Sequence, residues 1–142
     1  MTYALYMSTD YDILHTPLNH AWNPVVQFDW QAIAGMTLGL APGSDIVVLA
    51  HGNGHEIGNA EPGTVDIDAY TFLALIQANM NGGPPGRIFI STCGEGIAQF
   101  AAHVRLIAEA NDLWHHTEIF GHSDPVAGPV PPPHDLRWTQ IF

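Results

Sequence analysis

The sequence predicts an α/β domain built on a mostly parallel sheet. Three short runs of apolar and β-branched residues alternate with two segments whose apolar residues recur at helical spacing. This order is typical of parallel strands that are joined by crossover helices. A length of 142 residues and a hydrophobic content of 46% match one packed core. We therefore expect residues 1–142 to form a single domain.

The strands are predicted from short apolar runs with turn residues around them. Residues 2–7 (TYALYM) have the composition of a first strand. Residues 45–50 (DIVVLA) are almost continuously apolar, which indicates a strand that is buried on both faces. Residues 87–92 (RIFIST) and 117–121 (TEIFG) have the same character. The mixed pattern between residues 10 and 40 predicts no definite element.

Two helices are predicted between these strands. From Asp66 onward apolar residues recur at intervals of three and four, until NGGPPG at 81–86 ends the helix. The residues in this pattern are Ala69, Phe72, Leu73, Ile76 and Met80. The second helix is predicted from about Glu95 to Asn111. Its apolar face contains Ile97, Phe100, Ala101, Val104, Ile107 and Ala108.

A proline-rich segment, GPVPPPH at 128–134, follows the last predicted strand. Successive prolines fix φ and lack N–H donors, so this segment should be extended and irregular. It is expected to separate the compact body from a short C-terminal tail, LRWTQIF.

The charge balance excludes several classes of partner. The chain has three arginines, no lysine and 14 acidic residues, which give a formal net charge of −11. A nucleic-acid backbone or an anionic membrane surface requires cations, so both partners are disfavoured. A cationic peptide or a divalent metal would instead be attracted, although acidity also serves solubility alone.

The cellular compartment is predicted from the single cysteine and from the targeting and membrane-spanning segments that the sequence lacks. One cysteine allows no intramolecular disulfide. No run reaches the ~20 apolar residues that span a bilayer, and residues 1–12 lack the basic flank and long apolar region of a signal peptide. The expected location is therefore the cytoplasm, or the exterior after export without a classical signal peptide.

Reactive side chains follow three predicted strands at their carboxyl ends. His51 follows the strand at 45–50, Cys93 follows 87–92, and His122 follows 117–121. Ligands bind beyond the carboxyl ends of the strands in open parallel sheets. Neighbouring strands lie ~4.8 Å apart, so adjacent strands would bring His51 and Cys93 within reach of each other. The sequence therefore predicts a histidine–cysteine dyad.

The segments around these two residues have the composition of a reactive site. His51 lies in AHGNGHEIG, where glycines permit close approach of a substrate backbone. Cys93 lies in STCGEG at a predicted helix N-terminus, where backbone N–H groups favour a thiolate, although a lone cysteine is often only a small buried apolar residue. The string HGNG also occurs in α/β-hydrolases. Their nucleophile elbow is missing here, because Ser91 and Glu95 occupy its glycine positions.

A strand leads into VVLAHGNG, a crossover helix follows, and a second strand leads into RIFISTCGEG. The order of the predicted elements resembles that of the caspase-like cysteine peptidases of clan CD. This group includes caspases, legumains, gingipains and self-cleaving toxin domains. The resemblance covers residues 45–122, with 42 residues (93 − 51) between His51 and Cys93. It implies a three-layer caspase-like domain, with a mostly parallel sheet flanked by helices and no cofactor.

The resemblance also implies a role for each matching residue. Cys93 would be the nucleophile, and His51 the general acid that protonates the leaving amine. The backbone N–H groups of Gly52 and Cys93 would form the oxyanion hole. The chain would then be a thiol protease that cleaves a peptide or protein substrate.

Substrate-binding residues are predicted at the same edge of the sheet. Glu95, His122 and Asp124 lie near the predicted site, and the two carboxylates would suit a basic side chain at the cleavage position. Asp66 and Asp68 also lie near this edge. The ordinary explanation is favoured for all four acidic residues: Asp66, Asp68 and Glu95 as first-turn carboxylates of helices, and Asp124 as part of a turn with Pro125.

Two alternatives from other functional classes stay open. His51, Cys93 and His122 offer one thiolate and two imidazoles to a zinc ion, with His55 or Asp124 as a further ligand. The same fold could also be a non-catalytic module whose acidic face docks a cationic partner.

Overall fold

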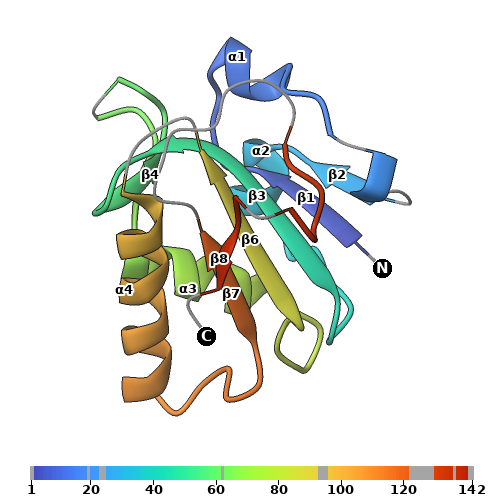
Figure 1. Cartoon of the computed structure of the whole chain (residues 1–142), viewed down its shortest axis with the longest axis vertical. Helices are drawn as coiled ribbons and strands as arrows, with labels where there is room; N and C mark the ends of the chain where they lie inside the picture. Colours follow the sequence, from blue (N-terminus) through green and yellow to red (C-terminus); the bar gives the residue numbers. More distant parts are fainter. Residues whose placement is uncertain are drawn as a thin grey trace.

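A mixed sheet of eight strands forms the centre of the protein. The computed structural model describes residues 2–18, 20–22, 25–61, 63–92, 96–121, 130–135 and 137–140. The main path of the sheet has the order β2-β1-β3-β6-β7-β8 (Figure 1). Its strands are β1 (Thr2–Tyr6), β2 (Val25–Phe28), β3 (Asp45–Gly52), β6 (Arg87–Thr92), β7 (Glu118–Gly121) and β8 (Thr139–Gln140). All neighbours on this path are parallel except β7 and β8, which confirms an α/β fold with a mostly parallel sheet.

A small hairpin extends the sheet beyond the carboxyl end of β3. β4 (Glu56–Gly58) pairs antiparallel with the end of β3, and β5 (Asp66–Asp68) pairs antiparallel with β4. The described residues also form a 3-10 helix, η1 (His20–Trp22), and four helices: α1 (Tyr11–Leu14), α2 (Trp30–Gly35), α3 (Ala69–Asn79) and α4 (Ile97–Ala110). Among the described residues, no helix has the length and apolar character needed to cross a membrane.

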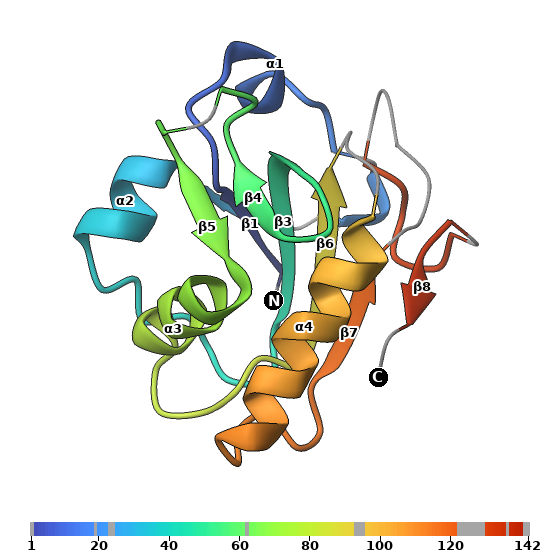
Figure 2. The same cartoon turned by 90° about the vertical axis from the view of Figure 1, so that its left-hand side faces the viewer.

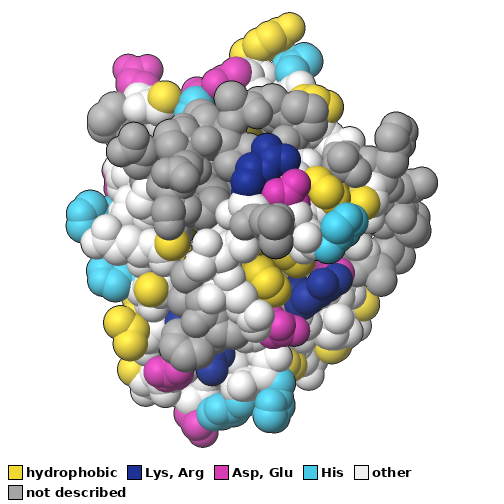
Figure 3. All heavy atoms as spheres, in the orientation of Figure 1, with side chains coloured by type: hydrophobic (Ala, Val, Ile, Leu, Met, Phe, Trp, Pro, Cys, Tyr) yellow, Lys and Arg dark blue, Asp and Glu magenta, His cyan; other side chains and the backbone are white. Residues whose placement is uncertain are grey.

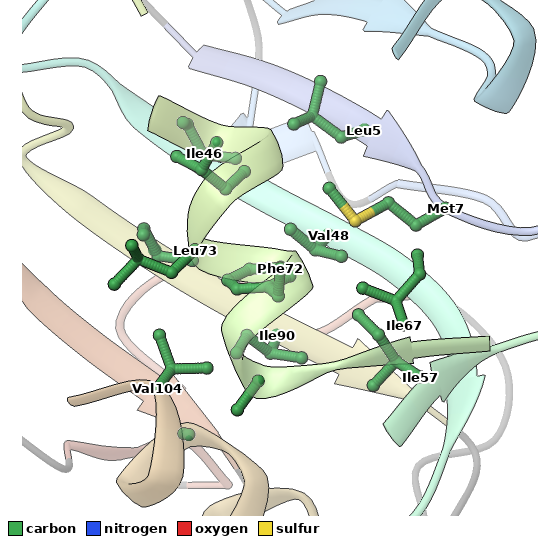
Figure 4. Close-up of a cluster of buried hydrophobic side chains, with 14 of the residues drawn as sticks. Leu5, Met7, Ile46, Val48, Ile57, Ile67, Phe72, Leu73, Ile90 and Val104 are labelled. Carbon is green, nitrogen blue, oxygen red and sulfur yellow. The ribbon is translucent and has the colours of Figure 1, made fainter. Parts of the chain in front are cut away.

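Helices and the hairpin cover one face of the sheet. Side chains alternate between the two faces along each strand, so Ile46 and Val48 of β3 point to this face together with Ile90 of β6 (Figure 4). Phe72 of α3 and Phe100 of α4 meet above them edge to face, with ring centroids 5.7 Å apart. Figure 2 shows α3 and α4 side by side in front of the sheet. This layer carries the larger apolar core.

An aromatic cluster covers the opposite face. Phe89 of β6 is fully buried and contacts the rings of Trp22, Phe120 and Trp138 at centroid distances of 4.9, 4.5 and 5.2 Å. The indole N–H groups of Trp22 and Trp138 donate to the carbonyls of Pro131 and Pro132. The proline-rich segment thus supplies acceptors to buried tryptophans.

The expected separation between the body and the C-terminal tail is therefore wrong. Trp138 is only 8% exposed, and Thr139–Gln140 adds a strand to β7. Apolar burial of the indole holds the tail on the sheet. The proline-rich segment contributes as well, because prolines lack N–H donors but keep carbonyl oxygens that accept hydrogen bonds from the indoles.

The predicted strands are confirmed to within two residues at each end, and both helices need a corrected start. Asp66–Asp68 is strand β5, with Ile67 buried between two exposed aspartates. Helix α3 begins at Ala69, because the Asp68 carboxylate accepts a hydrogen bond from the Thr71 N–H and caps the helix. Helix α4 begins at Ile97 rather than Glu95, after Gly96 in the left-handed conformation at φ 78°.

A charged pair sets the register of the two central strands. Asp45 and Arg87 lie opposite each other at the start of β3 and β6. The guanidinium donates two hydrogen bonds to the carboxylate, at 2.8 and 2.6 Å, in the fork geometry that fixes both groups. The pairing continues from there to Ala50 opposite Thr92.

We predict that Phe89→Ala lowers the free energy of unfolding by about 3 to 5 kcal/mol, because it removes the ring at the centre of the aromatic cluster. Urea denaturation followed by tryptophan fluorescence would measure the loss. Tyr70→Ala is the control, since this tyrosine is exposed and its loss should change stability by less than about 0.5 kcal/mol. A Phe89→Ala cost below about 1 kcal/mol would contradict the assigned packing.

Candidate functional site

The connections that follow three parallel strands meet at the carboxyl edge of the sheet. A Cβ built on Gly96, before α4, would lie 3.2 Å from the backbone nitrogen of Gly54 in the turn after β3. A Cβ on Gly121, at the end of β7, would lie 3.2 Å from the carbonyl oxygen of Ile97. Glycine at these positions permits backbone approaches that a side chain would prevent. The turn after β3 and the end of β7 therefore both contact the start of α4.

His51 lies at this edge, and two carboxylates hold its ring. Its Nε2 lies 3.0 Å from Oδ1 and 2.9 Å from Oδ2 of Asp12, and 3.5 Å from Oδ2 of Asp10. The His51 side chain is 18% exposed, whereas those of Asp10 and Asp12 are 28% and 63% exposed. Because a carboxylate only accepts, Nε2 carries the hydrogen of this contact.

Both aspartates are themselves oriented by the backbone. Asp10 Oδ2 accepts from the Ala60 N–H at 2.7 Å, and Asp12 Oδ1 accepts from the Ile13 N–H at 3.0 Å. Asp10 also stands at the N-cap position of α1, in extended conformation. The carboxylates are thus positioned independently of His51.

Asn59 joins the segment that carries the aspartates to the hairpin. Its side-chain oxygen accepts from the Ser8 hydroxyl at 2.6 Å and from the Thr9 N–H at 2.8 Å, and its amide donates to the Thr9 hydroxyl at 2.7 Å. The Ser8 hydroxyl in turn accepts from the Asp10 N–H. This network fixes the chain after β1 beside the chain after β4.

The contact with His51 changes the acidity of Asp12. The hydrogen bond from His51 is the main reason that the pKa of Asp12 lies below its ordinary value of 3.8, and the charge of His51 and the Ile13 N–H add to it. The carboxylate is therefore ionised under ordinary conditions and holds the ring as an anion.

The glycine-rich string after β3 forms a tight turn. The Asn53 side chain accepts from the N–H groups of His55 and Glu56, and the Asn53 N–H donates to the Glu56 carbonyl. The His55 side chain is exposed at this turn. Among the two histidines of the string, His51 alone belongs to the Asp–Asp–His group.

Gly52, predicted to supply an oxyanion-hole N–H, is also required by packing. A Cβ at this position would lie 2.7 Å from Ile57 Cγ2 and 3.2 Å from Ile97 Cδ1. Gly52 also pairs with Ile57 across β3 and β4. Any larger residue here would push the hairpin away from α4. The oxyanion role of its N–H stays a prediction.

The other predicted site residues, Cys93, Glu95, His122 and Asp124, lie outside the described residues. Of the three principal ligands in the zinc alternative, only His51 is described. The carboxylates of Asp66 and Asp68 accept from the backbone N–H groups of Gly63 and Thr71. Asp68 is therefore a helix-capping carboxylate, whereas Asp66 lies in strand β5.

Sequence reasoning missed Asp10 and Asp12. They lie in STDYD at 8–12, directly after the predicted strand 2–7. The rule that selected His51 and Cys93, a reactive side chain after a parallel strand, applies equally here. Because the mixed composition of residues 10–40 predicts no definite element, the sequence pattern does not single out these two aspartates.

Comparisons of the chain with protein-family models, with curated proteins and with solved structures found no match. The resemblance to caspase-like peptidases therefore rests on the motifs quoted above.

We predict that His51→Ala raises the pKa of Asp12 toward 3.8, because the main cause of its depression is lost. A carboxyl NMR titration would measure it. A depressed folded-state pKa stabilises the fold above the unfolded value, so this contribution should disappear as pH falls below 3.8 through the folded pKa. Asp68 is the control, since the Thr71 N–H chiefly lowers its pKa and that value should not move. An unchanged Asp12 titration would refute the contact.

We also predict that Gly52→Ala lowers the free energy of unfolding by about 1 to 3 kcal/mol, because the new methyl group overpacks against Ile57 and Ile97. Thermal and urea unfolding would measure the loss. Gly35→Ala provides the matched control, since no atom lies within 4 Å of a Cβ there. Equal stability of the two variants would be inconsistent with the assigned contacts.

Proposed function

We propose that the protein is a cysteine hydrolase of the peptidase type, with Cys93 as nucleophile and His51 as proton donor. The register of the two central strands is the observation that carries this proposal. Ala50 of β3 pairs with Thr92 of β6 in parallel, and His51 and Cys93 are the residues that follow this pair in the sequence. Adjacent strands lie ~4.8 Å apart, so side chains that follow this pair would be within reach of each other.

The alternation of side chains supports the same pairing. Val47 and Leu49 of β3 point to the face of the aromatic cluster, and so does Phe89 of β6. His51 is the next residue in the alternating series of β3 after Leu49, and residue 93 is in the same alternating series as Phe89 by its number. If the alternation of β6 extends by one residue, the thiol and the imidazole share a face.

The chemistry follows from these two groups and their surroundings. The Cys93 thiolate would attack the scissile carbonyl, and a hydrogen on His51 would pass to the leaving amine as the carbon–nitrogen bond breaks. Water would then release the acyl group from sulfur. Asp12 acts here as a positioning residue, since its carboxylate orients the ring.

A basic side chain suits the substrate at this edge. The aspartates 10 and 12 give it negative charge, and a pocket of about 580 Å³ lies between the residues that follow β1 and helix α2. Ser8, Thr9, Asp29 and Trp30 contribute to its lining, which combines an aromatic ring with a carboxylate. These features favour a lysine or arginine side chain over an acidic one.

The proposal predicts that a peptide chloromethyl ketone ending in lysine labels Cys93, and that His51→Ala slows labelling by about 10²- to 10⁴-fold. Intact-mass spectrometry over time would give the rates. His55→Ala is the matched control, because this exposed histidine lies in the same turn and outside the Asp–Asp–His group. Its rate should equal that of the wild type.

A second electrophile ending in glutamate tests the substrate class, and it should label Cys93 more slowly than the lysine compound. Equal labelling of the wild type and His51→Ala would reject the dyad. Faster labelling by the glutamate compound would reject only the preference for a basic residue.

A further inference from the structure

We propose that Asp10, Asp12 and His51 form a binding site for a divalent transition metal of the Zn²⁺ class. This site shares His51 with the zinc site that the sequence suggested, and its other two ligands are aspartates instead of Cys93 and His122. Each residue offers one ligand atom, and the three atoms lie within 4.8 Å of one another. The proposal does not depend on peptidase activity.

The spacing of the ligand atoms matches the size of a metal ion. Zinc binds nitrogen and carboxylate oxygen at about 2.0 to 2.2 Å, so two ligand atoms around one tetrahedral ion lie about 3.4 Å apart. The distances from His51 Nε2 to the carboxylate oxygens of Asp12 and Asp10 are 2.9 and 3.5 Å. A metal would take the position of the hydrogen that His51 now shares with these carboxylates.

The ligands come from the end of β3 and from the segment that follows its neighbour β1, and they are held in place. β1 pairs with β3 up to Tyr6 opposite Leu49, which brings the segment after β1 beside the end of β3. The Ala60 and Ile13 N–H groups fix the two carboxylates. Hydrogen bonds of this kind orient ligating carboxylates in metal sites.

The donor set selects the class of metal. One imidazole and two carboxylates suit Zn²⁺, Co²⁺ or Mn²⁺ better than Ca²⁺ or Mg²⁺, which prefer oxygen ligands alone. Three protein ligands leave room for water, and the exposure of Asp12 gives the ion a path from solvent. Acidic and histidine side chains are exposed at the end of the molecule that carries α1 and also at the opposite end (Figure 3). The net charge of −11 further favours a cation.

Calorimetric titration of the full chain with Zn²⁺, and of a parallel sample with Co²⁺, tests the site. We expect one equivalent to bind. Asp10→Asn and Asp12→Asn should each weaken Zn²⁺ binding by at least about tenfold, because asparagine keeps the shape and loses the charge. In the wild type, Zn²⁺ should also shift the ¹⁵N resonance of His51 Nε2, a readout that needs no variant.

Two control variants make the test specific. Asp112→Asn removes the carboxylate of an exposed histidine–aspartate pair with His115, where Nε2 and Oδ1 are also 2.9 Å apart, and it should leave Zn²⁺ affinity unchanged. Cys93→Ser removes the thiol and should also leave it unchanged. Unaltered affinity in both Asp10→Asn and Asp12→Asn, a loss of binding in Cys93→Ser, or an unshifted His51 resonance would each overturn the proposal.

Discussion

The parallel pairing of β3 and β6 is the constraint on which the rest of the site depends. Asp45 and Arg87 join the two strands at their first residues, and the pairing runs unbroken to Ala50 and Thr92. A shift of one residue would turn every side chain of β6 to the opposite face. It would take Phe89 out of the aromatic cluster and turn it toward the helical face. The charged pair stands at the start of this register, at the edge opposite His51.

Two cores of different construction keep this pair of strands in place. Helical packing covers one face, whereas tryptophans held by proline carbonyls cover the other. The second arrangement needs no long helix, because each indole buries a large apolar area and satisfies its own N–H. Glycines then let the chain turn closely around the start of α4. Stability and site geometry consequently share the same residues, as Gly52 shows.

The aspartates around His51 link the two proposed roles of this edge. A carboxylate that accepts a hydrogen bond from a histidine nitrogen can instead share a metal ion with the same nitrogen. Both interactions place positive charge between the two groups. The His51 Nε2 has room for one of them at a time.

The sequence by itself determined the parallel α/β fold, four strands and the core faces of two helices, because apolar periodicity reports burial directly. It also singled out His51, since the residue follows a buried strand. Only the tertiary structure decided that Asp66–Asp68 pairs as a strand, that Trp138 belongs to the core, and that Asp10 and Asp12 hold His51. These features depend on contacts between segments far apart in the chain. Local periodicity carries no information on such contacts, and a carboxylate becomes a partner only when folding brings it to the ring.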